Sequence, residues 1–138
     1  MDWKLLKSKI VFDNFTQIEE RIYKLPDGST KKIYIKLNRP ATCILALTED
    51  NQVLLVEQFR PGPGKVLTEL PGGYVDEGET SKEAAQRELR EETGYEGRLA
   101  FVTDCFDDAY TTMQRACFVA TGLKESVTRI LMMENLST

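Results

Sequence analysis

The chain has 138 residues, of which 41% are hydrophobic and 29% charged, and its formal net charge is −4. Such a chain is long enough for one soluble domain with its own core, and its negative charge argues against a general attraction to nucleic acid or to an anionic membrane surface. It has no histidine, which excludes histidine general bases, Ser–His and Cys–His pairs and His-ligated zinc, and leaves polar chemistry to carboxylates, Lys, Arg, Tyr and hydroxyls.

The amino-terminal part predicts an antiparallel β-hairpin. Two segments, 17–25 and 31–37, flank a Pro-Asp-Gly-Ser sequence, which is a strong turn signal. Ile33, Ile35 and Leu37 alternate with Lys and Tyr side chains, as in a half-buried strand. We therefore expect a β arm whose apolar face packs on its own domain or on a second subunit.

Two later segments predict central strands. Residues 42–48 and 53–59 are nearly continuous apolar runs, and such runs are typical of strands covered on both faces. An irregular loop at 61–64 and a short strand at 67–70 follow. Further strands are expected at 97–103, 116–120 and 127–133.

A helix is predicted between Thr80 and Gly94. Thr80 with Glu83 three residues later resembles a capping box, and Gly94 suits the left-handed position after the last turn. Ala84, Ala85 and Leu89 give a narrow apolar stripe that would pack on a sheet. The opposite side of the helix carries the acidic residues.

The order of strands, one helix and further strands indicates an α/β fold with a mixed sheet and at least one covering helix. No convincing second helix is visible for the other face of the sheet. We expect residues 1–138 to form a single domain, with the arm at 1–38 and the core at 39–138.

Three glutamates of the helix suggest a metal site. Helical spacing brings Glu88, Glu91 and Glu92 onto one face, and two carboxylates about 4 Å apart repel by roughly 4 kcal/mol at an effective dielectric constant of about 20. A charged helix face is usually just solvated, but Gly72 and Gly73 precede this helix and its acidic face has no lysine. Because Mg²⁺ prefers oxygen ligands and often joins carboxylates to substrate phosphates, the pattern favours a metal site for a phosphorylated ligand.

The segment 73–95 reads Gly-x5-Glu-x7-Arg-Glu-Leu-x-Glu-Glu-x-Gly-Tyr. It resembles the Nudix box of the Nudix hydrolases at every fixed position, and its one departure is Tyr95 in place of a bulky aliphatic residue. The resemblance implies a Nudix-type α/β/α sandwich. It also implies structural roles for Gly73, Glu79, Arg87 and Gly94, and a charge-assisted pair between Arg87 and Glu79 would fix the loop to the helix.

The resemblance extends beyond the box. The sequences Val-Glu-Gln-Phe-Arg at 56–60, Glu-Leu-Pro-Gly-Gly at 69–73 and Leu-Pro-Asp-Gly at 25–28 are similar to the ADP-ribose pyrophosphatase and nucleoside-diphosphate-sugar hydrolase branch. Members of that branch typically dimerise through such an amino-terminal arm. The similarity therefore implies a homodimer and a nucleotide-sugar substrate.

The same similarity implies a site. The carbonyl of Gly72 and the carboxylates of Glu88 and Glu92 would hold Mg²⁺ or Mn²⁺, and Glu91 would be a further ligand or would position water. Two more residues match positions near the substrate: Arg60, which suits a bidentate grip on a phosphate unless it is an ordinary surface residue, and Glu69, which could equally cap its loop.

The chain departs from this branch after the box. The usual Ser-Pro-Gly loop is absent, which leaves nucleotide sugars other than ADP-ribose open. Near the position of the expected glutamate stands Gln114, which cannot ionise, so Asp107, Asp108 or Glu91 would have to act as the base. The closing helix of the family is also expected to be short or missing.

We therefore expect metal-dependent hydrolysis of a nucleoside diphosphate sugar to a nucleoside monophosphate and a sugar phosphate. One alternative is a Nudix fold that senses a nucleotide without cleaving it. Another is a Nudix hydrolase of nucleoside triphosphates or dinucleotides. No nucleic-acid or membrane partner is expected.

The cysteines bear on the compartment. Cys43, Cys105 and Cys117 are odd in number, lie among apolar neighbours and form no CxxC motif, so they are predicted to be small core residues. The amino end has no apolar stretch long enough for a signal peptide or a membrane span. A cytoplasmic location is the expectation.

Overall fold

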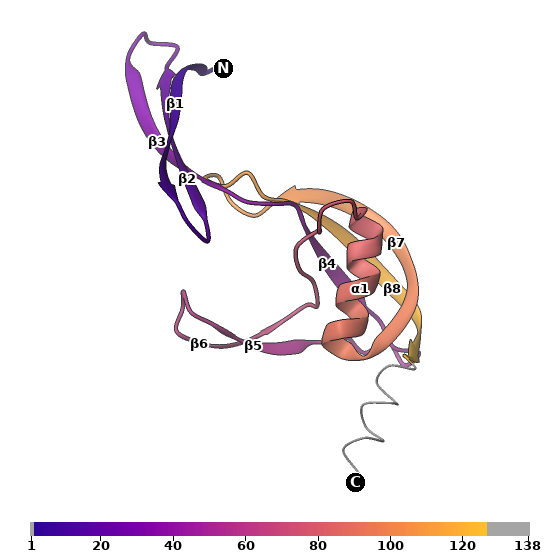
Figure 1. The fold of residues 1–138 in the computed structure, drawn as a ribbon. Coiled ribbons are helices and arrows are strands. Elements are labelled where there is room, and N and C mark those ends of the chain that lie inside the picture. The colour runs from indigo at the N-terminus through magenta and orange to yellow at the C-terminus, as the bar shows by residue number, and fades with distance from the viewer. Residues whose placement is uncertain (1, 127–138) are drawn as a thin grey trace. The chain divides into compact units, whose positions relative to one another are not determined.

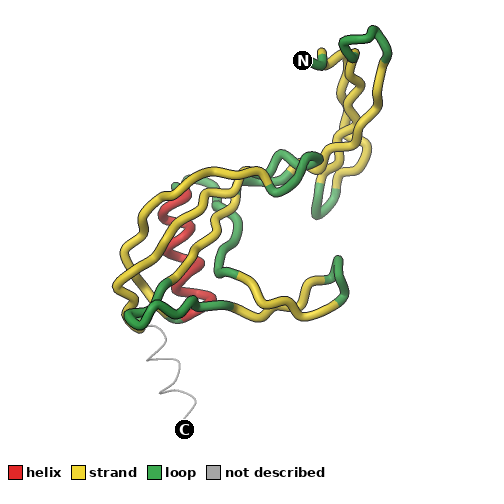
Figure 2. The backbone as a smooth tube through the Cα atoms, turned by 180° about the vertical axis from the view of Figure 1, so that it is seen from behind, coloured by secondary structure: helices red, strands yellow, loops and turns green. Residues whose placement is uncertain are grey.

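The computed structural model describes residues 2–126. These residues fall into two compact units, one made of 2–39 with 106–114 and the other of 40–105 with 115–126. The elements of both units are labelled in Figure 1, and Figure 2 shows the strands and the helix from behind. The assignment of 1–138 to a single domain stays a prediction.

The first unit is built on a three-stranded antiparallel sheet. Its strands are β1 (Lys4–Asp13), β2 (Gln17–Lys24) and β3 (Thr30–Leu37), in the order β1-β2-β3. The predicted hairpin is confirmed, because β2 and β3 pair throughout their length and the Leu25 amide donates to the Ser29 carbonyl (2.9 Å) across the turn.

Strand β1 was not predicted from the sequence. Its apolar residues come in adjacent groups, Leu5 with Leu6 and then Ile10, Val11 and Phe12, instead of alternating with polar ones. The structure explains this pattern, because its pairing with β2 shifts in register twice, between residues 5 and 7 and between 10 and 12. Register shifts of this kind break the two-residue period by which a strand is recognised.

The alternation predicted for β3 is confirmed. Ile35 is buried, Ile33 and Leu37 are half-buried, and the intervening side chains are exposed. The segment 110–112 joins the same unit, since the Lys36 amide donates to the Tyr110 carbonyl (2.8 Å) and the Thr112 amide to the Lys36 carbonyl (3.0 Å).

The second unit holds the sheet β4-β8-β7, made of β4 (Ala41–Ala46), β8 (Gln114–Glu125) and β7 (Tyr95–Phe106). Strands β4 and β8 run parallel, and the helix α1 (Ser81–Thr93) lies across one face of this sheet (Figure 1). The core between helix and sheet consists of buried apolar side chains: Ile44, Ala46, Ala85, Leu89, Ala116, Phe118 and Ala120.

The ends and the apolar stripe of α1 agree with the sequence. Thr80 caps the helix and forms a capping box with Glu83, and Gly94 ends it in the left-handed conformation with φ 73°. The predicted stripe is buried in full. These features are local, and this is why the sequence predicts them.

The expectation of a central strand at 53–59 was wrong. Strand β5 (Val56–Arg60) pairs only with β6 (Lys65–Glu69) among the described residues, and it is exposed or half-buried along its length. The reason is that one edge of β4 pairs with β8, while the segment 71–73 bonds to its other edge through the amides of Thr42 and Ile44. The predicted strand bonds only to the end of β4, where the Leu54 amide donates to the Ala46 carbonyl (3.0 Å), and β5 itself then pairs with β6.

Three other expectations concern the end of the chain and the cysteines. Strands β7 and β8 are longer than predicted, whereas the strand at 127–133 and the question of a closing helix lie outside the described residues. Cys43 and Cys117 are half-buried, but Cys105 is exposed, because β7 is an edge strand of its sheet. No helix of residues 2–126 is long and apolar enough to cross a membrane.

Candidate active site

The site is built on the short segment that precedes the Gly-x5-Glu pattern. The Thr42 amide donates to the Gly73 carbonyl (2.8 Å) and the Ile44 amide to the Pro71 carbonyl (2.9 Å), so this segment lies along the edge of β4. A Cβ at Gly72 would stand 2.2 Å from the Thr42 carbonyl oxygen. The close approach therefore requires glycine at 72.

Glu92, in the last turn of α1, reaches back to this segment. Its Oε2 accepts a hydrogen bond from the Gly72 amide (2.8 Å), and its Oε1 accepts one from Nε2 of Gln58 on β5 (2.5 Å). Both oxygens of the carboxylate are thus fixed in direction. Gln58 is a residue that the sequence reasoning missed, although it lies within the 56–60 segment whose similarity to the branch was noted.

Glu88, one turn earlier, lies against the next glycine. A Cβ at Gly73 would stand 2.3 Å from Oε1 and 2.5 Å from Cδ of Glu88. The side chain at 73 must therefore be absent for this carboxylate to lie where it does. Two carboxylates of α1 therefore lie against consecutive glycines. Glu92 accepts a hydrogen bond from the Gly72 amide, and Glu88 occupies the space that a side chain at position 73 would fill.

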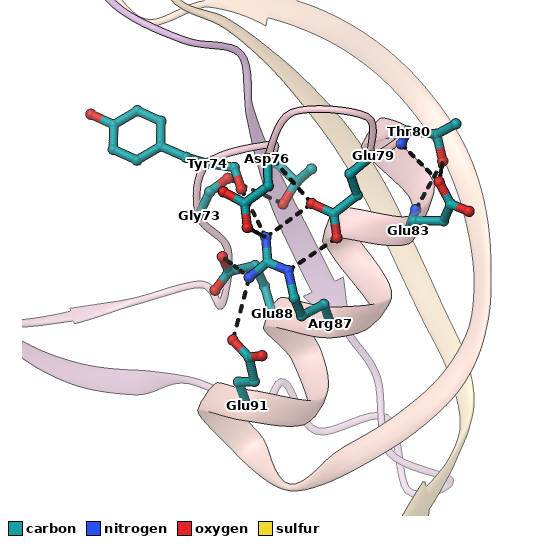
Figure 3. A network of polar contacts seen from close by, with 10 residues as sticks. Gly73, Tyr74, Asp76, Glu79, Thr80, Glu83, Arg87, Glu88 and Glu91 are labelled. Atoms are coloured by element: carbon teal, nitrogen blue, oxygen red, sulfur yellow. Dashed lines mark hydrogen bonds and ion pairs between the residues drawn. The ribbon is translucent and has the colours of Figure 1, made fainter.

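Arg87 holds the loop and the helix together (Figure 3). It binds Glu79 through two bonds, Nε to Oε1 (3.0 Å) and Nη2 to Oε2 (3.1 Å), and its Nη2 also donates to the Tyr74 carbonyl (3.0 Å). The predicted pair of Arg87 with Glu79 is therefore present. The hydrogen bonds that Arg87 donates to Glu79 and then to Glu88 raise its pKa above the ordinary value, so the guanidinium stays charged.

The expectation that three glutamates crowd into one cluster was wrong in its geometry. Glu88 (2.7 Å) and Glu91 (3.3 Å) both accept from Nη1 of Arg87, whereas Glu92 turns to Gln58 and Gly72. Within residues 2–126, no three acidic or cysteine side chains gather closely enough to hold a metal ion by themselves. Arg87 bonds to both Glu88 and Glu91 and so relieves the repulsion between their carboxylates. The metal site itself stays a prediction.

Arg60 and Glu69, predicted near the substrate, form an ion pair. Nε and Nη2 of Arg60 both bind Oε2 of Glu69, at 2.8 and 2.6 Å. The hydrogen bond to Glu69 is the main cause that raises the pKa of Arg60. The negative charge of Glu92 also raises it, so the guanidinium lies close enough to Glu92 to interact with it electrostatically. Their contact with a substrate stays a prediction.

Two of the residues considered as the base belong to the other unit. Asp107 and Asp108, like Gln114, are part of the segment 106–114, which clusters with the first unit. Asp108 accepts a hydrogen bond from the Tyr110 amide (2.5 Å) and so shapes its own loop. Glu91 is the one proposed base on α1, and its side chain is 55% exposed.

The residues present fit a hard divalent cation. Carboxylates and backbone carbonyls are the ligands that Mg²⁺ and Mn²⁺ prefer, and Glu88 and Glu92 converge on two adjacent glycines where no side chain fills the space. In the part of the chain that the structure describes, fewer than three acidic or cysteine side chains gather at any such point. This is consistent with a site completed by water and by substrate phosphates.

A model of the NUDIX domain matches residues 37–130. The chain belongs to the Nudix family. Among curated relatives it is 35% identical to the methanol dehydrogenase activator of Bacillus methanolicus (67% of this chain, 51% of the relative). It is 29% identical to the ADP-ribose pyrophosphatase of Bacillus subtilis (83% and 56%) and 52% identical to the ADP-sugar pyrophosphatase of Mus musculus (62% and 44%).

A solved structure shows the same fold. It is the crystal structure of an ADP compounds hydrolase, with a TM-score of 0.80, 23% identity, and coverage of 91% of this chain and 70% of that chain. The expected Nudix fold is thus confirmed. The chain spans about half the length of the curated relatives described above.

The contact between Gly73 and Glu88 gives a first prediction. In Gly73→Ala the new methyl group would overlap the Glu88 carboxylate, and a flexible side chain can move aside. We expect the free energy of unfolding in urea to change by less than about 1 kcal/mol, and the affinity for Mg²⁺, measured by calorimetry, to fall about tenfold or more. Gly62→Ala is the control, because its Cβ meets nothing within 4 Å. Equal Mg²⁺ affinity in both variants would refute the assignment of Glu88.

The pKa of Glu79 gives a second testable prediction, on how stability depends on pH. Hydrogen bonds from Arg87 and from the Asp76 amide hold this pKa below its ordinary value, so the stabilisation is present above pH 4.5 and is lost as the pH falls through the lowered pKa. The difference in melting temperature between the wild type and Glu79→Gln should therefore shrink between pH 6 and pH 3. Glu57→Gln, at an exposed position of β5, should follow the wild type throughout. A difference that is constant with pH would contradict this account.

Proposed function

We propose that the chain is a divalent-metal-dependent pyrophosphohydrolase that cleaves the diphosphate of an ADP-sugar such as ADP-ribose. The products would be a nucleoside monophosphate and a sugar phosphate. The observation that carries the proposal is the placement of Glu88 and Glu92 on two adjacent glycines. The names of two relatives, an ADP-ribose and an ADP-sugar pyrophosphatase, support this choice of substrate.

The Gly72 carbonyl, Glu88 and Glu92 would hold Mg²⁺ or Mn²⁺, with Glu91 as a further ligand or as the residue that orients water. A cation bound there neutralises diphosphate charge and lowers the pKa of a bound water. Gln58 and the Gly72 amide keep Glu92 in one orientation by their two hydrogen bonds. This fixed arrangement lowers the reorganisation that the reaction requires.

Arg60 would bind a phosphate oxygen. Its side chain is 45% exposed, and its guanidinium bonds to a single oxygen of Glu69, which leaves N–H donors for a second acceptor. Glu69 then orients the guanidinium and does not compete for all of its donors. In this arrangement, Arg60 would position the diphosphate while the glutamates of α1 act at the bond that breaks.

The test is incubation of the chain with Mg²⁺ and a panel of ADP-sugars, nucleoside triphosphates and dinucleotides, with products followed by ³¹P NMR. A nucleoside monophosphate formed fastest from an ADP-sugar is the expected result. Faster cleavage of triphosphates or dinucleotides would assign the chain to a different group of Nudix hydrolases. Tight binding of ADP-ribose without any product under Mg²⁺ or Mn²⁺ would make it a sensor.

We also propose a homodimer formed through the arm. Strand β1 is an edge strand, and it exposes several large apolar side chains: Leu5, Leu6, Ile10, Val11 and Phe12. An exposed edge with such residues is a surface for pairing with a second chain. A cytoplasmic location is part of the same proposal, and cell fractionation tests it.

Replacement of Ile10 by Lys tests the dimer. Because a charge on β1 would be buried in the contact at high cost, we expect the mass measured by light scattering to fall from that of two chains to that of one. Val66→Lys, at a comparably exposed apolar position on β6, is the matched control and should remain a dimer. A wild type that is monomeric at every concentration would end the proposal.

A further inference from the structure

The three cysteines form a row across the sheet of the second unit. Cys43 of β4 is the register partner of Cys117 of β8, and Sγ of Cys117 lies 3.7 Å from Sγ of Cys105 on the neighbouring strand β7. Ile44, Ala116 and Phe118 belong to the core with α1. Since side chains alternate along a strand, Cys43 and Cys117 lie on the sheet face away from the helix.

The two thiols in contact differ in exposure. Cys105 is exposed, whereas Cys117 is half-buried, and its Sγ also lies 3.8 Å from the Arg115 carbonyl. Burial, followed by the hydrogen bond with Cys105, raises the pKa of Cys117 to about 11. Cys117 therefore stays protonated at neutral pH, and an oxidant in solution meets Cys105 first.

We propose that Cys105 and Cys117 are an oxidisable dithiol pair, in which hydrogen peroxide oxidises Cys105 and Cys117 then resolves it to an intramolecular disulfide. The pair lies outside the carboxylate site and does not depend on the proposed hydrolase activity. A disulfide requires an S–S distance of about 2.05 Å. The two sulfur atoms are 3.7 Å apart on neighbouring strands, so side-chain rotation would have to bring them together. This assigns a modification site to two residues that the sequence had placed in the core.

The chemistry is balanced with hydrogen peroxide as the oxidant. The Cys105 thiolate attacks one oxygen, the O–O bond breaks, and Cys105 becomes a sulfenic acid while hydroxide leaves and takes up a proton as water. The Cys117 sulfur then attacks the Cys105 sulfur. The S–O bond breaks, the Cys117 proton goes to the leaving hydroxide, and a second water is released.

A disulfide between Cys105 and Cys117 would enclose the segment 106–116, which contains residues considered for the active site. Residues 106–116 contain Asp107 and Asp108, which were considered for the base, and Gln114, which stands near the position of the family's glutamate. A link between 105 and 117 would restrict the conformations open to this stretch. Oxidation of the pair would therefore limit the motion of the segment that carries Asp107, Asp108 and Gln114.

The test uses the wild-type chain and peptide mapping. Each cysteine lies on its own tryptic peptide, Cys43 in 37–65, Cys105 in 99–115 and Cys117 in 116–124. After treatment with hydrogen peroxide, alkylation and digestion without reductant, we expect 99–115 joined to 116–124 and 37–65 alkylated as a thiol. Dithiothreitol should restore all three thiols. Unlinked peptides, or 37–65 joined to 116–124, would overturn the proposal.

Single substitutions extend the test. Cys43→Ser should give the same linked pair, and its loss would overturn the assignment of partners. In Cys117→Ser the sulfenic acid has no resolving thiol beside it, so a dimedone adduct should accumulate on 99–115. If the adduct appears instead on 37–65, Cys105 is not the residue that peroxide oxidises, and the proposal fails.

Discussion

Replacing Glu92 with Gln should lower kcat/KM on the ADP-sugar about a hundred- to a thousandfold. The substitution keeps the size of the side chain and removes the charge that would hold the cation. It also puts an NH₂ group in place of one of the two carboxylate oxygens, beside either the Gly72 amide or the Gln58 Nε2, both of which donate to the present carboxylate. The measurement is product formation by chromatography at saturating Mg²⁺ and at several substrate concentrations.

The control for this experiment is Glu57→Gln, which makes the same chemical change at an exposed position of β5 next to Gln58. It should retain the kcat/KM of the wild type within about twofold, because surface substitutions away from a site have small effects. Wild-type activity in Glu92→Gln would remove this glutamate from the mechanism. An equal loss in both variants would point to a general effect of charge.

Gly72→Ala should be the most destabilising substitution at the site. The new Cβ would stand 2.2 Å from the Thr42 carbonyl oxygen, 3.0 Å from the Thr42 carbonyl carbon and 3.1 Å from the Cys43 Cα, all of them backbone atoms of β4. Since a strand cannot move aside as a side chain can, the segment would leave the edge of β4. We expect a loss of about 3 kcal/mol in the free energy of unfolding, measured by urea denaturation.

Two other glycines make this prediction specific. Gly62→Ala, which meets nothing within 4 Å, should change stability by less than about 0.5 kcal/mol, and Gly73→Ala meets only a movable carboxylate. A stability loss in Gly72→Ala no larger than that in Gly62→Ala would mean that the segment does not lie along β4 as described. The order of the three variants is thus a direct check of the backbone that carries the site.

The features predicted correctly from the sequence are the local ones. Thr80, Glu83 and Gly94 define the ends of α1 by contacts within a few residues, and the pair of Arg87 with Glu79 follows from charge and spacing. The turn at 26–29 follows from its own residues in the same way. Such interactions depend little on the rest of the fold.

The errors arose where distant parts of the chain decide. Strand β5 has an apolar sequence that suits a central strand, but the segment 71–73 occupies the edge of β4 that it would need. Gln58 was missed because its partner Glu92 comes 34 residues later. Helical spacing placed the glutamates on one face, yet Arg87 and Gln58 draw their carboxylates in different directions.

The central claim is that Glu88, which lies against Gly73, and Glu92, which is bonded to Gly72, form a cation site for a diphosphate. Its most direct test is a titration of Mn²⁺ in the presence of ADP, followed by the electron paramagnetic resonance signal of the free ion, with the wild type and the variant Glu88→Gln/Glu92→Gln. We expect the wild type to bind Mn²⁺ and the variant to bind it at least tenfold more weakly, while circular dichroism shows both to be folded. Equal binding by the two folded proteins would contradict the claim.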